Sequence, residues 1–161
     1  SLDYAEKIND LIEINYIKQN IASAYFSEEK YNIGKVYLDE IANYVQKNGQ
    51  VEARLTYYSL LGEYYFVMKN YALAEKNYLK SVEISKENKI EISSCDLERL
   101  KTYIRIPTES NRVAFVNILE KYIFTYNINV NDFNISQYLL VESSNEFQQN
   151  ANIFLSDYLE R

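Results

Sequence analysis

The sequence predicts an all-α fold, and three observations lead to that prediction. Helix-breaking residues are scarce, with three glycines and one proline in 161 residues, whereas folds rich in strands need many tight turns. Apolar residues recur at intervals of three to five, as in Ile8, Leu11, Tyr16 and Ile21, which is typical of one helical face. Short polar segments separate these runs. We therefore expect about seven helices in a single domain, residues 1–161.

Local signals place the ends of the expected helices. Gly49 follows the second periodic run, where a helix end accepts a residue in the left-handed conformation. Pro107 closes the fifth run, because the residue before a proline disfavours helical geometry. The segment 108–110 offers N-caps for the sixth helix, and Asp132 offers one for the last. The expected helices span residues 2–26, 29–47, 51–67, 71–85, 90–106, 111–127 and 133–159.

Composition narrows the class of protein. The net charge is −6 with a pI near 4.8, which argues against nucleic-acid binding by this domain, since such surfaces need Lys and Arg to neutralise phosphates. The single cysteine, Cys95, cannot form an intrachain disulfide. No apolar run reaches the length of about 18 residues that a membrane span requires, and no signal peptide opens the chain. We expect a cytoplasmic location and, because the chain starts at Ser1 without methionine, part of a longer protein.

Residues that carry chemistry are few. The chain has no histidine, which removes catalytic triads and most zinc sites. Cys95 lies beside Asp96, whose charge disfavours the thiolate. Glu28 and Glu29 stand at a helix start, where negative charge suits the helix dipole. Three scattered glycines cannot form a phosphate-binding loop. We therefore expect no enzyme, no cofactor and no metal.

An internal repeat organises the first half of the chain. Residues 21–41 superimpose on residues 61–81 with an offset of 40. Small residues match small ones and aromatic residues match aromatic or large apolar ones, as expected when two helices pack closely. The aligned pairs are Ile21 and Leu61, Ala22 and Gly62, Tyr25 and Tyr65, Tyr31 and Tyr71, Gly34 and Ala74, and Leu38 and Tyr78.

The second copy carries a motif. Tyr58-x2-Leu61-Gly62-x2-Tyr65, followed by Ala74-x3-Tyr78, resembles the tetratricopeptide pattern W-x2-L-G-x2-Y…A-x3-F. The resemblance implies a right-handed superhelix of antiparallel helix pairs, with clear repeats at about 14–48 and 54–88. Residues 89–161 are then a degenerate helical region that ends in a long capping helix. Of the paired tyrosines we expect Tyr58 and Tyr65 to be buried, and Tyr57 and Tyr64 to be exposed.

The resemblance also implies a binding surface, because the first helix of each tetratricopeptide pair lines the concave side. We expect the apolar side chains of a peptide to dock near Phe26 and Phe66, while Gln19 and Ser59 bond its backbone. The lysines, arginines and asparagines with which the chaperone-binding members hold a C-terminal carboxylate are absent here. The expected binding residues are Tyr16, Gln19, Ser23, Phe26, Thr56, Ser59, Glu63 and Phe66.

Two functions are compatible with these features. The chain looks like a peptide- or protein-binding domain, similar to the repeat domains of the peptide-sensing transcriptional regulators of Gram-positive bacteria. The alternative is a structural oligomerisation or assembly scaffold without a small ligand, for example a homodimer formed through Leu140, Phe147 and Phe154. The predicted binding stripe could also be filled by helix 133–159 of the same chain.

Overall fold

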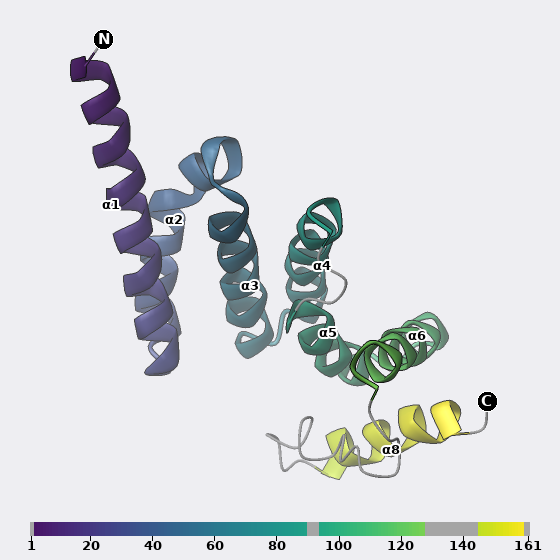
Figure 1. The fold of residues 1–161 in the computed structure, drawn as a ribbon. Coiled ribbons are helices and arrows are strands. Elements are labelled where there is room, and N and C mark those ends of the chain that lie inside the picture. Colours follow the sequence, from purple (N-terminus) through teal and green to yellow (C-terminus); the bar gives the residue numbers. More distant parts are fainter. Residues whose placement is uncertain (1, 90–93, 128–144, 160–161) are drawn as a thin grey trace. The chain divides into compact units, whose positions relative to one another are not determined.

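Every described element of the computed structural model is an α-helix, as the sequence predicts (Figure 1). The structure describes residues 2–89, 94–127 and 145–159. They belong to two compact units, Ser1–Glu91 and Ile92–Arg161, and the first unit contains both predicted repeats. The helices are α1 (Leu2–Ser27), α2 (Tyr31–Asn48), α3 (Val51–Val67), α4 (Tyr71–Glu87), α5 (Ser94–Arg105), α6 (Glu109–Tyr126) and α8 (Asn145–Leu159).

The predicted boundaries agree with the observed ones to within a few residues wherever both can be compared. The third helix, α3, has the predicted bounds Val51–Val67. The described parts of the predicted helices 90–106 and 133–159 are α5, Ser94–Arg105, and α8, Asn145–Leu159. The first residues of both predictions, including Leu140, lie outside the described residues, as does the predicted cap Asp132.

Side-chain caps start two of the helices. Thr108 takes an extended backbone conformation before α6, and its hydroxyl oxygen accepts a hydrogen bond from the Asn111 N–H at 3.2 Å. Asn70 plays the same part before α4, where its side-chain oxygen accepts from the Leu73 N–H at 3.3 Å. Each cap satisfies one of the backbone donors that a helix start leaves unpaired. The N-cap predicted within residues 108–110 is therefore confirmed.

The predicted left-handed conformation of Gly49 is wrong. Its φ is −63° and its ψ is 138°, which is extended, and its N–H donates to the Val45 carbonyl oxygen at 3.1 Å. A Cβ at this position would lie 2.5 Å from that oxygen, so space, not a positive φ, explains the glycine. Positive φ occurs instead at non-glycine residues that include Glu29, Lys69 and Lys89.

The turns α1–α2 and α3–α4 are built alike. Glu29 and Lys69 occupy positions that the offset of 40 aligns, and both have a φ of 59°. The backbone hydrogen bonds around them also match in partners and length. They run from Glu29 to Phe26 and from Lys69 to Phe66, at 2.9 Å each, and from Lys30 to Tyr25 and from Asn70 to Tyr65, at 2.8 Å each. The sequence repeat therefore corresponds to a structural one.

A small residue and a large one meet where α3 and α4 pack, and the first repeat has a small and a large residue at the aligned positions. In the α3–α4 pair, a Cβ on Gly62 would lie 2.8 Å from Cζ of Tyr78 and closer still to two other ring carbons. In the α1–α2 pair the aligned residues are Ala22 and Leu38, both fully buried. The repeat with the smaller residue on its first helix, Gly62, thus has the larger residue on its second helix, Tyr78. This exchange is what a closely packed core would require if Ala22 and Leu38 take the places of Gly62 and Tyr78.

The second small residue of the repeat supports an aromatic ring. A Cβ on Gly34 would lie 2.6 Å from Cε1 of Phe26 and 2.9 Å from the Ala22 carbonyl oxygen. Phe26 packs edge-on against Tyr31, with 5.4 Å between the ring centroids. Phe66 and Tyr71 form the corresponding pair, also at 5.4 Å. The ring at the end of the first helix therefore packs on the start of the second in both repeats.

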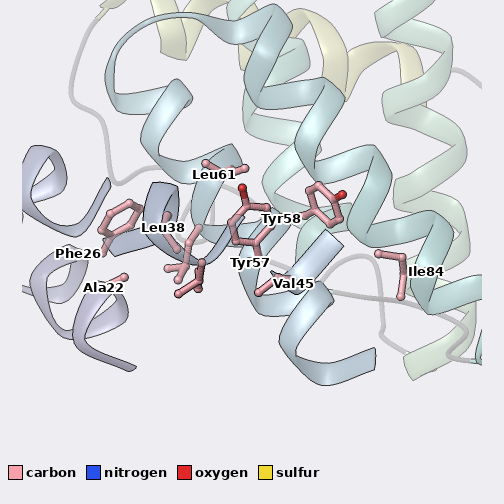
Figure 2. Close-up of a cluster of buried hydrophobic side chains, with 10 residues drawn as sticks. Ala22, Phe26, Leu38, Val45, Tyr57, Tyr58, Leu61 and Ile84 are labelled. Atoms are coloured by element: carbon pink, nitrogen blue, oxygen red, sulfur yellow. The ribbon is translucent and has the colours of Figure 1, made fainter. Parts of the chain in front are cut away.

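The core of the first unit is shared among its four helices (Figure 2). Tyr57 and Tyr58 are both buried, with 2% and 8% of their surface exposed, so the prediction of an exposed Tyr57 is wrong. α2 covers that side of α3, because Tyr57 shares a core cluster with Leu38, Ile41 and Val45 of α2. Tyr64 and Tyr65 are half-buried, so neither the predicted exposure nor the predicted burial is complete. The core residues labelled in Figure 2 are Ala22, Phe26, Leu38, Val45, Tyr57, Tyr58, Leu61 and Ile84.

The second unit has its own core, formed by α5, α6 and α8. The rings of Phe115 and Phe154 meet edge-on at 5.1 Å, and the Asn150 side-chain amide donates to the Ile104 carbonyl oxygen at 3.2 Å. Phe154 is fully buried in this core, so it cannot form the dimer contact that the sequence analysis assigned to it. The side chain of Phe147 is not among the described ones.

Candidate binding surface

The contacts of α1 define which of its sides is open. The Lys18 ammonium pairs with Glu40 of α2 at 2.6 Å, and the Gln19 amide donates to the Ala53 carbonyl oxygen of α3 at 3.1 Å. Successive residues of a helix are about 100° apart, so Tyr16 lies beyond Gln19, on the side away from α2. The same is true of Ser23, one turn further on. Tyr16 is 64% exposed and Ser23 is half-buried.

α3 has an open side as well. Tyr57 faces α2, with whose residues Leu38, Ile41 and Val45 it shares a core cluster. Tyr58 faces α4, since the Lys80 ammonium lies 5.0 Å from the centre of its ring. The side that neither neighbour covers carries the four α3 residues predicted to bind a peptide. Thr56 is exposed, and the other three are half-buried, namely Ser59, Glu63 and Phe66.

Two of the eight predicted binding residues do not reach the surface. Gln19 is 5% exposed, and its amide joins α1 to the backbone of α3. Phe26 is 3% exposed and lies between Gly34 and Tyr31. Neither residue presents a surface on which a peptide could dock, so the docking near Phe26 and the backbone bond from Gln19 are not supported. The predicted stripe on α1 therefore included two residues of the side that packs against α2 and α3.

Two exposed carboxylates escaped the sequence prediction. Glu13 is one turn before Tyr16 on α1, and Glu52 is one turn before Thr56 on α3. The spacing of three and four residues that defined the predicted stripes would have reached both if each stripe had been extended by one turn. We use the name α1–α3 face for the exposed and half-buried residues of this side, which are Glu13, Tyr16, Ser23, Glu52, Thr56, Ser59, Glu63 and Phe66.

The α1–α3 face carries negative charge. Glu13, Glu52 and Glu63 belong to it, whereas the basic residues with described side chains on the same two helices face elsewhere. Lys18 is paired with α2, and the helical positions of Lys7 and Arg54 place them on the opposite sides of α1 and α3. The face is thus acidic, and lysine and arginine are confined to other sides of these helices in the described part.

One tyrosine at the end of the face responds to this charge. Burial raises the pKa of Tyr31 above its ordinary value, and the carboxylates of Glu63 and Glu29 raise it further. The effect of Glu63 shows that its carboxylate lies within electrostatic reach of the turn between α1 and α2. The acidic field therefore extends from α3 to the start of α2.

Within the described residues, no group of three or more acidic, cysteine or histidine side chains lies close enough together to hold a metal ion. Cys95 is buried in the second unit. None of the helices in the described part is long and apolar enough to cross a membrane. The α1–α3 face remains the candidate functional site.

Comparison with known proteins does not assign the chain to a family. The chain matches no family model, and neither the curated proteins nor the solved structures contain a match to it. The likeness to tetratricopeptide proteins therefore rests on the residues of the chain alone, and the two matched turns show a helical repeat.

Proposed function

We propose that the chain is a tetratricopeptide-like domain that binds a peptide or protein partner on the α1–α3 face. The observation that carries this proposal is the matched construction of α1–α2 and α3–α4, in which the aligned residues Tyr16 and Thr56 are both exposed. A superhelix of antiparallel pairs would align the sides that carry these two residues into one continuous surface. Such a domain would suit the sensor part of a peptide-responsive transcriptional regulator.

The composition of the face suits an extended peptide. Tyr16 is a largely exposed ring, and Phe66 offers a half-buried one. Aromatic residues supply large contact areas at low entropic cost, and are enriched at interfaces. The hydroxyls of Thr56 and Ser59 can donate to or accept from a peptide backbone. The face thus combines apolar anchors with adaptable polar groups.

Selection from a random peptide display library tests the proposal. The unaltered chain should enrich a set of related peptides, and the variant Tyr16→Ala/Phe66→Ala should lose that enrichment while keeping its far-UV circular dichroism spectrum. The matched control Glu83→Ala/Lys86→Ala changes exposed residues of α4 and should leave the selection intact. Equal enrichment by the unaltered chain and by the face variant would refute the proposal.

A scaffold function has one observation in its favour. Leu11, Ile14 and Ile17 are 48%, 49% and 48% exposed on one side of α1. The offset of 40 aligns Ile17 with Tyr57, which is only 2% exposed because the preceding helix pair covers it. In an oligomer another chain would cover the corresponding side of α1.

Molar mass by light scattering over a range of concentrations distinguishes the scaffold from the binding domain. A scaffold should be oligomeric without ligand, and Ile14→Glu/Ile17→Glu should convert it into a monomer. A monomer at every concentration would leave the binding function as the better account of the fold.

A further inference from the structure

We propose that Asn48 is a site of spontaneous deamidation, and that the isoaspartate formed there loosens the junction between α2 and α3. Asn48 is the last residue of α2, and Gly49 follows it. It is the sole asparagine of the sequence that precedes a glycine. The modification concerns the chain itself, so it is independent of the proposed peptide binding.

The reaction is the attack of a backbone nitrogen on the preceding side chain. The Gly49 amide nitrogen loses its proton to solvent and bonds to the side-chain carbonyl carbon of Asn48. The bond from that carbon to the side-chain nitrogen breaks, and the nitrogen takes a proton from water and leaves as ammonia. Water then opens the resulting succinimide ring at either of its two carbonyl carbons. One opening gives aspartate, and the other gives isoaspartate, in which the main chain runs through the former side chain. Glycine hinders this attack least, because it has no side chain.

Packing explains why glycine occupies position 49 despite this reactivity. A Cβ there would lie 2.5 Å from the Val45 carbonyl oxygen and 3.0 Å from the Val45 Cα, and both are backbone atoms. An alanine or a larger residue would therefore displace the end of α2 or the start of α3. The close approach at the helix end thus imposes the residue that makes Asn48 reactive.

The side chain of Asn48 is accessible, whereas the attacking nitrogen is restrained. Asn48 is exposed, and its side chain makes no hydrogen bond to another described residue. The Gly49 N–H donates to the Val45 carbonyl oxygen at 3.1 Å. This hydrogen bond belongs to the last turn of a helix, where backbone bonds open at little cost in free energy. The fold therefore slows the reaction without preventing it.

The connection that follows Asn48 is too short to absorb an altered main chain. Only Gly49 and Gln50 separate α2 from α3. Isoaspartate adds one carbon atom to the main chain at this point, while residues of α2 and α3 are held together in one core cluster. Val51, the first residue of α3, is half-buried against the same cluster. We expect the added atom to shift the start of α3 and to weaken this packing.

Peptide mapping by mass spectrometry tests the reaction in the folded chain. During incubation at mildly alkaline pH, the replacement of the side-chain NH2 by OH should be detected at Asn48 before any other asparagine. A methyltransferase specific for isoaspartate should label the same position. The rate should rise about tenfold for each pH unit, because the fraction of deprotonated backbone amide rises by that factor. Asn48→Gln should abolish the early signal, and the matched control Asn20→Gln, at an exposed position of α1, should retain it.

A synthetic peptide of residues 44–53 shows how strongly the fold protects Asn48. The peptide should react faster than the folded chain, but by no more than about tenfold, because the opening of a terminal helical turn costs little. An unmodified folded chain after full conversion of the peptide would overturn the proposal. Earlier reaction at another asparagine would overturn it as well.

Urea denaturation tests the effect on the junction. Ion exchange separates the deamidated chains, since each carries one additional negative charge. The isoaspartyl chain should unfold at a lower urea concentration than the unmodified chain and than Asn48→Asp, which adds the same charge but keeps the ordinary main chain. Equal midpoints for the isoaspartyl chain and for Asn48→Asp would overturn the loosening of the α2–α3 junction.

Discussion

Replacing Gly62 with alanine tests whether the repeat is built by exchanging volume between its two helices. In an exposed helix this change stabilises the fold by about 1 kcal/mol, because alanine has the higher helix propensity. Here the added Cβ would meet the Tyr78 ring, with 2.8 Å to Cζ. Tyr78 is 1% exposed, so its ring has little room to move. We expect overpacking at a cost of about 1–3 kcal/mol to outweigh the propensity gain.

The first helix pair supplies the compensating change. Ala22 and Leu38 occupy the aligned positions and are both fully buried. Tyr78→Leu alone should cost about 2 kcal/mol or more, because it leaves a cavity. The double variant Gly62→Ala/Tyr78→Leu reproduces the pair found in the first repeat. It should be more stable than the two separate losses imply, with a coupling of about 1–3 kcal/mol.

Urea denaturation followed by far-UV circular dichroism measures these free energies of unfolding. Thr56→Ala, at an exposed position of α3, controls for helix propensity and should change stability by only a few tenths of a kcal/mol. If Gly62→Ala stabilised the protein as it does in an exposed helix, the close contact with Tyr78 would be refuted. If the two changes were additive, the idea that the repeats conserve a sum of volumes would fail.

Three further predictions concern single side chains. Gln19→Ala should lower the free energy of unfolding by about 1 kcal/mol, since the hydrogen bond to the Ala53 carbonyl oxygen is lost. The control Asn20→Ala, at an exposed position of the same helix, should not lower it in the same denaturation assay. Burial raises the pKa of Tyr57, so near pH 10 the folded state keeps a proton that the unfolded state releases. The contribution of Tyr57 to the free energy of unfolding should be fully present below about pH 10 and should fall as the pH rises through the raised pKa. Tyr57→Phe should reduce that fall when unfolding is measured from about pH 9 to pH 11. Thr108→Ala should cost about 1 kcal/mol in thermal or urea unfolding because the cap of α6 is lost, whereas Thr108→Ser should retain most of the stability; equal stability of the two variants would contradict the capping role.

The features that depend on local chemistry were predictable from the sequence. Helix existence follows from apolar periodicity, and the start of α6 follows from Thr108, because a hydroxyl before a helix caps it whatever lies elsewhere. The close packing at Gly62 was also predictable, since a glycine inside a helix needs a packing reason. The prediction for Gly49 failed because the same residue type serves two purposes, positive φ and lack of a Cβ, and only the second applies there.

The orientation of each helix about its own axis depends on neighbours that are distant in sequence. Gln19 and Ser23 are one turn apart, yet the first is buried against Ala53, 34 positions away, and the second is half-buried. Tyr57 is buried by α2 although its periodicity allows an exposed position. A rotation of a few tens of degrees moves a residue from a stripe into the core, and periodicity alone does not resolve it. The sequence by itself therefore determined the helices, their order and the repeat, because these follow from local spacing and residue volume. Only the tertiary structure decided that Gln19 and Phe26 belong to the core and that Glu13 and Glu52 join Tyr16 on the open side, because burial depends on which helices meet.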